Sequence, residues 1–133
     1  MKVLELLELV QGECIVSDAE QRFPEAAVAG DYVRQGDVYV WMLDGVPQGV
    51  SPAKASLQVV EGTTKGSRHC LDSLAGVEMF VMPDADVLTG PVLRLSEERV
   101  LNHPEHGDWI LGPGCYAITY QRQFAEELKR AMD

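Results

Sequence analysis

Three residues that commonly bind metals stand within four consecutive positions, His103, Pro104, Glu105 and His106. Proline fixes φ near the value that the second position of a type I or type II turn requires, and the two ends of such a turn lie within about 7 Å of each other. The motif therefore predicts a turn that brings the two imidazoles together. Imidazole nitrogens bind zinc and other divalent metals, and the Glu105 carboxylate could add an oxygen ligand.

The only other histidine, His69, follows a polar, glycine-bearing segment between two predicted strands. A histidine at such a place can point into the mouth of a β-barrel, where small ligands and metals often bind. His69, His103, His106 and Glu105 are therefore the candidate site for zinc or another divalent metal. The alternative is that the histidines are solvated, or hydrogen-bonded to neighbouring groups, and hold a loop in place.

Two further residues are candidate ligand contacts, Arg122 and Tyr116. The planar guanidinium of Arg122 could hold a carboxylate or a phosphate, although an ion pair with one of the many acidic residues is the alternative. For Tyr116 the alternative is a place in the core. The H-E-x-x-H, G-x-S-x-G, P-loop and dinucleotide motifs are missing, so no catalytic residue is assigned.

The first 34 residues have a different pattern of apolar and polar residues from the rest of the chain. Apolar residues recur at spacings of three and four between Val3 and Val10, which is typical of an amphipathic helix. Ser17 has the character of a helix cap, and Pro24 predicts that this second helix ends near Phe23. At the other end, Phe124, Leu128 and Met132 recur every four residues and predict a short C-terminal helix.

From Gly36 onward the sequence favours short strands separated by glycine and proline turns. Residues 46–55, with two prolines, are expected to form a loop. A mainly β fold follows, a small antiparallel barrel or sandwich of about seven strands. We expect one domain over residues 1–133, with residues 1–34 packing as an extension on a β-rich core of residues 35–133. The expected strands are 37–43, 57–60, 77–82, 92–95, 100–101, 109–111 and 115–121.

Composition and charge limit the classes of molecule that the chain is expected to bind. The chain has 133 residues and a formal net charge of −10. An acidic protein without clustered Lys and Arg is not expected to bind nucleic acid. No apolar run approaches the ~20 residues of a membrane span, and nothing resembles a signal peptide. Three dispersed cysteines indicate reduced thiols, so we expect a cytoplasmic protein.

The order and spacing of several motifs resemble a group of small bacterial and phage proteins of unknown function. The resemblance covers about residues 35–124. Ser67 stands where the group has the first histidine of its G-H-x-H motif, and Gln123-Phe124 replaces its E-Y. The resemblance implies that His69, His103 and His106 act together, and it assigns no activity. The segments that carry it are Gln35-Gly36-Asp37-Val38, Glu61 to His69, Leu101 to His106, Gly114-Cys115-Tyr116 and Gln121-Arg122.

Three functions follow from these observations. The first is a small β-barrel module that binds a divalent metal or a small polar ligand through the histidines. The second is a non-catalytic accessory or assembly protein, of a phage-related kind, in which the histidine turn is structural and the N-terminal segment packs against a partner or a second copy. The third is a metal-dependent hydrolase or isomerase with Glu105 as its general base.

Overall fold

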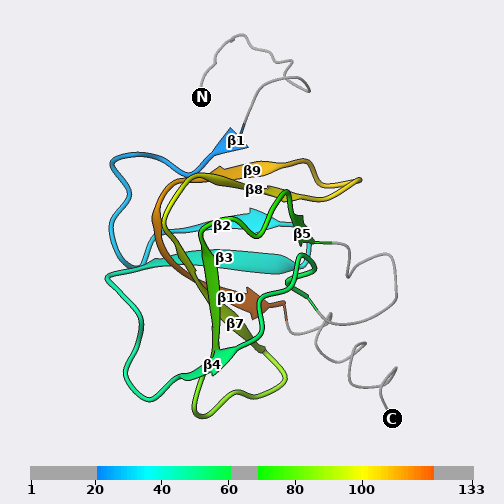
Figure 1. The fold of residues 1–133 in the computed structure, drawn as a ribbon. Coiled ribbons are helices and arrows are strands. Elements are labelled where there is room, and N and C mark those ends of the chain that lie inside the picture. The colour runs from blue at the N-terminus through cyan, green and yellow to red at the C-terminus, as the bar shows by residue number, and fades with distance from the viewer. Residues whose placement is uncertain (1–20, 61–68, 122–133) are drawn as a thin grey trace, which may run out of the picture.

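The computed structural model describes residues 21–60 and 69–121, and ten strands in these ranges form two sheets (Figure 1). The strands are β1 (Gln21–Arg22), β2 (Tyr32–Gln35), β3 (Val38–Leu43), β4 (Ser51–Ala53), β5 (Cys70–Leu71), β6 (Val77–Val81), β7 (Thr89–Leu95), β8 (Arg99–Asn102), β9 (Trp109–Leu111) and β10 (Gly114–Tyr120). The larger sheet has the order β2-β3-β10-β7-β6-β4, and the smaller one has the order β1-β9-β8-β5.

Strand β10 is at the centre of the larger sheet. It pairs antiparallel with β3 from Cys115↔Leu43 to Tyr120↔Val38, and with β7 on its other side. Successive side chains of a strand point to opposite faces, and Tyr116 and Ile118 accordingly share the buried face. The smaller sheet is mixed, because β1 runs parallel to β9 whereas the other pairs are antiparallel.

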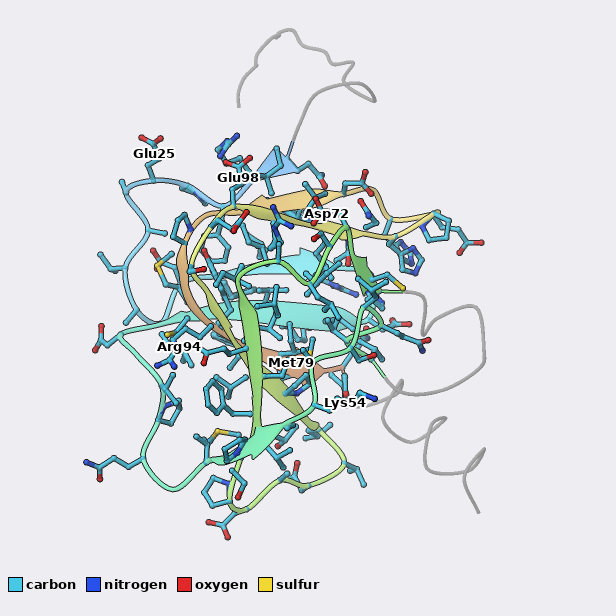
Figure 2. The ribbon with its side chains drawn as sticks, viewed as in Figure 1. Glu25, Lys54, Asp72, Met79, Arg94 and Glu98 are labelled. Carbon is cyan, nitrogen blue, oxygen red and sulfur yellow. The ribbon has the colours of Figure 1, made fainter. Side chains whose placement is uncertain are left out.

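The two sheets enclose one hydrophobic core. Met79 of β6 lies inside the molecule, whereas Arg94 and Glu25 project outward (Figure 2). Burial of apolar side chains is the main favourable term in folding, at about 25 cal/mol per Å². The members of the core come from both sheets and from the segments beside them: Phe23, Val33, Val38, Val40, Val59, Val60, Leu71, Met79, Leu93, Leu95, Leu101, Leu111, Tyr116 and Ile118.

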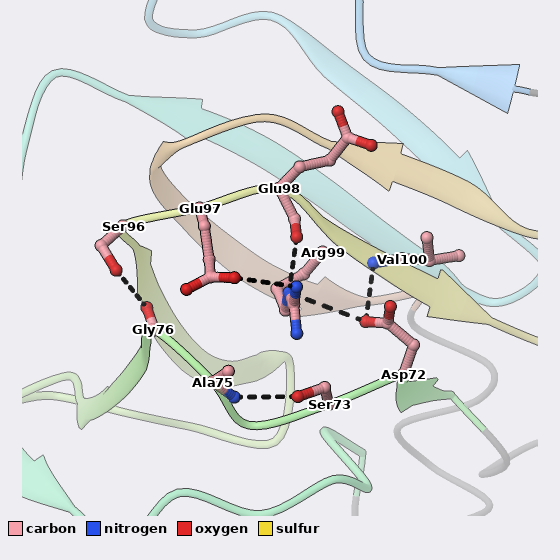
Figure 3. A network of polar contacts seen from close by, with 9 residues as sticks. All are labelled: Asp72, Ser73, Ala75, Gly76, Ser96, Glu97, Glu98, Arg99 and Val100. Atoms are coloured by element: carbon pink, nitrogen blue, oxygen red, sulfur yellow. Dashed lines mark hydrogen bonds and ion pairs between the residues drawn. The ribbon is translucent and has the colours of Figure 1, made fainter.

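A polar network holds the corner where the chain passes from β7 in the larger sheet to β8 in the smaller one (Figure 3). The Arg99 side chain lies between the carboxylates of Asp72, at 3.9 Å, and Glu97, at 3.1 Å. Asp72 also accepts a hydrogen bond from the backbone N–H of Val100 at 3.0 Å. These contacts fasten the residues after β5 to the start of β8, and so fix β5 beside β8.

The mainly β class is confirmed, and most of the predicted strands are present with shifted ends. The predictions at 37–43, 77–82, 92–95, 100–101, 109–111 and 115–121 correspond to β3, β6, β7, β8, β9 and β10. Strand β7 begins three residues before its prediction, because Thr89 pairs with Thr119 across a bulge that local patterning does not reveal.

The closed barrel is wrong. Within the described ranges each sheet ends in two edge strands, β2 and β4 in the larger and β1 and β5 in the smaller, so neither sheet closes on itself. The reason is that the chain changes sheet at short corners. Residues 72–76, 96–98 and 112–113 form three of these corners, and the last contains Pro113, which has no N–H to continue a ladder.

The predicted helices find no support, since residues 21–60 and 69–121 contain no helix, and hence none that could span a membrane. The helix expected to end near Phe23 is wrong for its last residues, because Gln21 and Arg22 form β1. The backbone N–H of Phe23 donates to the Ile110 carbonyl at 2.9 Å, so pairing with β9 outweighs the local cap pattern. The helices predicted near residues 3–10 and 124–132 lie outside the described residues.

Three further expectations need correction. Residues 57–60 make only an isolated bridge, Gln58↔Cys70, rather than a strand, although Val59 and Val60 are buried. The expected loop 46–55 contains β4. Among the strands of the described residues β4 pairs only with β6, and an edge strand of this kind tolerates Pro52. Strand β2 begins at Tyr32, whereas the sequence favoured strands only from Gly36 onward.

Candidate functional site

The three histidines lie in a row. The ring centroids of His69 and His103 are 4.5 Å apart, and those of His103 and His106 are 4.4 Å apart. His69 and His103 are buried, whereas His106 is exposed. The predicted turn therefore does bring His103 and His106 together, and the fold adds His69 from the residue before β5. The row runs from the interior of the protein to its surface.

The turn is closed by the His103 side chain itself. The backbone N–H groups of Glu105 and His106 donate to the His103 Nδ1 atom at 3.0 and 3.1 Å, and the N–H of Gly107 donates to the His103 carbonyl at 3.2 Å. A nitrogen that accepts two hydrogen bonds carries no proton, so the neutral His103 ring carries its proton on Nε2. This Nε2 atom is buried.

Gln35, at the end of β2, ties the turn to both sheets. Its amide nitrogen donates to the carbonyl of Leu101 at 2.8 Å and to that of Gly107 at 2.6 Å. Two carbonyl acceptors fix the orientation of the amide, so its oxygen is the atom that faces the His69 Nδ1 at 2.7 Å. The His69 Nδ1 therefore donates, and the lone pair of the neutral ring is on its buried Nε2.

His106 packs directly against the β2–β3 turn. Gly36 has a φ of +60°, and a Cβ atom built on it would lie 2.3 Å from the His106 Cδ2. Only glycine gives both the left-handed backbone and the space for the ring. Asp108 completes the arrangement by accepting a hydrogen bond from the backbone N–H of His103 at 3.3 Å. Gln35 and Gly36 therefore contact the histidine turn together, Gln35 through hydrogen bonds and Gly36 through packing against the His106 ring.

This geometry limits metal chemistry. In the described parts of the chain, no three His, Cys, Asp or Glu side chains are arranged to hold a metal ion. Both inward-facing Nδ1 atoms are engaged with protein groups, and the remaining Nε2 of His103 carries a proton in the neutral ring. A metal ligand needs a free lone pair, and neither Nδ1 atom offers one, because that of His103 accepts two hydrogen bonds and that of His69 carries a proton. The hydrogen bonds of His103 and Gln35 instead attach the histidine turn to the interior of the protein.

The side chains of Glu105 and Tyr116, two other predicted site residues, take no part in this network. The Glu105 side chain is exposed, and only its backbone N–H joins the turn. Tyr116 is buried in the core against Phe23, with ring centroids 5.5 Å apart. Arg122 lies outside the described residues. The residue that sequence reasoning missed is Gln35. Its presence in the Gln35-Gly36-Asp37-Val38 motif was the available signal.

The Tyr116 hydroxyl gives a testable pH effect. It donates to the Gly112 carbonyl at 2.8 Å, and burial, with a smaller contribution from Cys115, raises the pKa of Tyr116 above 10.0. A raised pKa means that the folded state favours the neutral phenol. The contribution of Tyr116 to the free energy of unfolding is therefore complete below pH ~10 and is lost as the pH rises further. Chemical denaturation between pH 8 and 11 should show this loss in the wild type. Tyr116→Phe should weaken it and cost about 1 kcal/mol at pH 8.

Comparison with known proteins gives one match. The family described as Domain of unknown function (DUF8820) matches residues 34–121. No curated protein and no solved structure showed a significant match to the chain. The matched region begins at the residue before Gln35 and includes Gly36, His69 and the whole histidine turn. The chain therefore belongs to the DUF8820 family, a domain of unknown function.

Proposed function

We propose that this domain is a non-catalytic accessory module in which the histidine turn is structural. The observation that supports this best is the Gln35 amide, which contacts three partners at once, the carbonyls of Leu101 and Gly107 and the Nδ1 of His69. Such a network is worth most when every member is satisfied, and it then specifies one arrangement of the chain. In this role the histidines place the turn, and contacts with other molecules are made elsewhere on the surface.

The chemistry of the turn also favours this role over catalysis. A general base on Glu105 would act beside a bound metal, yet His103, the central ring of the row, uses its Nδ1 lone pair for two backbone hydrogen bonds. Binding a metal through His103 would require either breaking those bonds or removing the Nε2 proton. Both changes cost free energy. The hydrogen bonds within the turn are therefore favoured over metal binding by His103.

Metal addition tests the proposal. Zinc or nickel at up to a hundredfold molar excess should leave the melting temperature unchanged, and dialysed protein should contain no stoichiometric metal by mass spectrometry. If the protein had a metal site, free metal at 100 times the Kd would instead stabilise the fold by about 2.7 kcal/mol. That stabilisation would raise the melting temperature of a domain of this size by roughly 10 °C. His106→Ala is the control, because it removes the exposed ring and should leave the response to metal unchanged.

A second candidate is the binding of a divalent metal or a small polar ligand. The row of three imidazoles favours it, because neighbouring ring centroids are 4.5 and 4.4 Å apart. This candidate predicts the opposite response to added metal. Zinc should then raise the melting temperature, His106→Ala should reduce the increase, and the effect should fade below about pH 6 as imidazoles protonate. A stoichiometric metal that survives dialysis would replace the structural proposal with this one.

A further inference from the structure

We propose that the chain's own N-terminal segment, residues 1–20, docks on an aromatic surface of the β2–β3 hairpin. The aromatic surface consists of Tyr32, Tyr39 and Trp41, with Arg34 beside them. It lies on the face of the larger sheet opposite to the core, because Val33, Val38 and Val40 alternate with these residues and are buried. This inference does not depend on the histidine turn.

The rings of the aromatic surface are held in place. Tyr32 lies opposite Trp41 in the strand pairing, with ring centroids 4.6 Å apart, and Tyr39 is 5.7 Å from Tyr32. The Trp41 indole N–H donates to the Thr119 hydroxyl at 2.8 Å. The Tyr32 side chain nevertheless remains 53% exposed. Rigid Tyr and Trp side chains that stay accessible are the type of residue that dominates binding energy at interfaces.

Arg34 gives this surface a positive charge in an acidic chain. Its guanidinium lies 5.7 Å from the Tyr39 ring centroid and donates to the Gly36 carbonyl at 2.7 Å and to the Gln121 side chain at 3.2 Å. None of the four residues of the aromatic surface carries a carboxylate. An occupant with apolar side chains and negative charge would therefore complement it.

A pocket of about 310 Å³ adjoins the aromatic surface, and Tyr32 lines it. Its lining is mostly apolar and includes Phe23, Pro24, Ala27 and Val33. The carboxylate in this lining, Asp31, accepts a hydrogen bond from the Val28 backbone N–H at 3.0 Å. The pocket could therefore take an apolar side chain, such as leucine, from an occupant that lies along Tyr32.

The N-terminal segment has the matching chemistry. Residues 1–20 carry five carboxylates against one lysine, and five apolar residues lie between positions 4 and 10, namely Leu4, Leu6, Leu7, Leu9 and Val10. An apolar and acidic segment is the occupant that an aromatic surface with one arginine would favour.

The segment also joins the fold at the right place. Gln21 pairs with Trp109, and the Trp109 indole N–H donates to the Arg34 carbonyl on β2 at 3.1 Å. Residues 1–20 therefore precede a residue whose strand partner, Trp109, contacts β2. Val10 and Gln21 are eleven positions apart, and an extended chain of that length reaches about 36 Å. A tether this short gives an effective concentration in the millimolar range, so even a weak contact would be populated.

Site-specific photo-crosslinking in the full chain tests this inference. A benzophenone amino acid placed at Tyr32 should crosslink to residues 1–20, as mapped by peptide mass spectrometry. The same probe at Val87, which is 49% exposed, is the matched control and should give at least fivefold less of this product. Leu7→Asp in the Tyr32-probe protein should lower the yield at least fivefold, whereas Leu7→Met should preserve it.

Two outcomes would overturn the inference. Equal yields of the N-terminal product from the probes at Tyr32 and Val87 would show that the contact is not specific. In a mixture of light and ¹⁵N-labelled protein, crosslinks that join light to heavy chains would assign the surface to a second copy instead of the chain's own segment. Circular dichroism of each variant verifies folding, and the probe moved to Tyr39 gives a second measurement if the Tyr32 variant does not fold.

Discussion

Gln35→Ala should destabilise the protein by about 3–5 kcal/mol, the largest effect expected of any single substitution described for this chain. The change removes one side chain and leaves three partners without their hydrogen bonds. The Leu101 carbonyl and the Nδ1 of His69 belong to buried residues, whereas the carbonyl of Gly107 belongs to an exposed one. Each unsatisfied buried group costs about 1–3 kcal/mol. Equilibrium unfolding in urea, monitored by tryptophan fluorescence, measures the change in free energy.

Two variants define the cause of this loss. Gln48→Ala changes an exposed glutamine of a loop and should stay within about 0.5 kcal/mol of the wild type. Gln35→Glu preserves the size of the side chain, but an ionised carboxylate cannot donate to two carbonyls, so it should be as harmful as alanine. A loss below about 1 kcal/mol in Gln35→Ala would show that the network does not hold the turn.

Gly36→Ala should cost about 2–4 kcal/mol, from two separable causes. The first is the left-handed backbone, with φ of +60°, which costs an L-residue about 1–2 kcal/mol. The second is the new methyl group, which would lie 2.3 Å from the His106 ring and must displace it from the hairpin. Thermal and urea unfolding of the full chain measure the sum of the two.

Gly30→Ala is the matched control for the backbone term. Gly30 has φ of +97°, and a Cβ atom built there meets nothing within 4 Å. A φ of +97° is less favourable for an L-residue than +60°, so any cost of Gly36→Ala beyond that of Gly30→Ala is a lower bound on the clash with His106. The double variant Gly36→Ala/His106→Ala should recover this excess. If the double variant is no more stable than Gly36→Ala, His106 does not pack on the hairpin in solution.

Local rules accounted for the turn and for most strands. Pro104 is enough to predict that His103 and His106 approach each other, because it acts over four residues. The alternation in residues 115–121 likewise accounts for the shared face of Tyr116 and Ile118, which the structure buries, since the period of a strand is two residues. Both features depend on residues that are neighbours in the chain, so the sequence was sufficient for them.

Non-local pairing accounts for what local patterns missed. Gln21 and Arg22 follow a pattern typical of a helix cap, yet they pair with β9, almost ninety residues later in the chain. The tautomer of His69 likewise follows from the orientation of the Gln35 amide, which is set by the carbonyls of Leu101 in β8 and of Gly107 in the turn. No pattern within one segment contains that information.

The amino-acid sequence by itself determined the mainly β class, the histidine turn and the acidic character of the chain, because these follow from backbone preferences, side-chain spacing and composition. Tertiary structure alone decided the use of His69. Packing of two sheets placed Gln35 among Leu101, Gly107 and His69, and so engaged the Nδ1 proton of His69, whereas the lone pair of His103 is engaged by backbone N–H groups of its own turn. The physical reason is that the role of an imidazole depends on its hydrogen-bond partners, which only the fold provides.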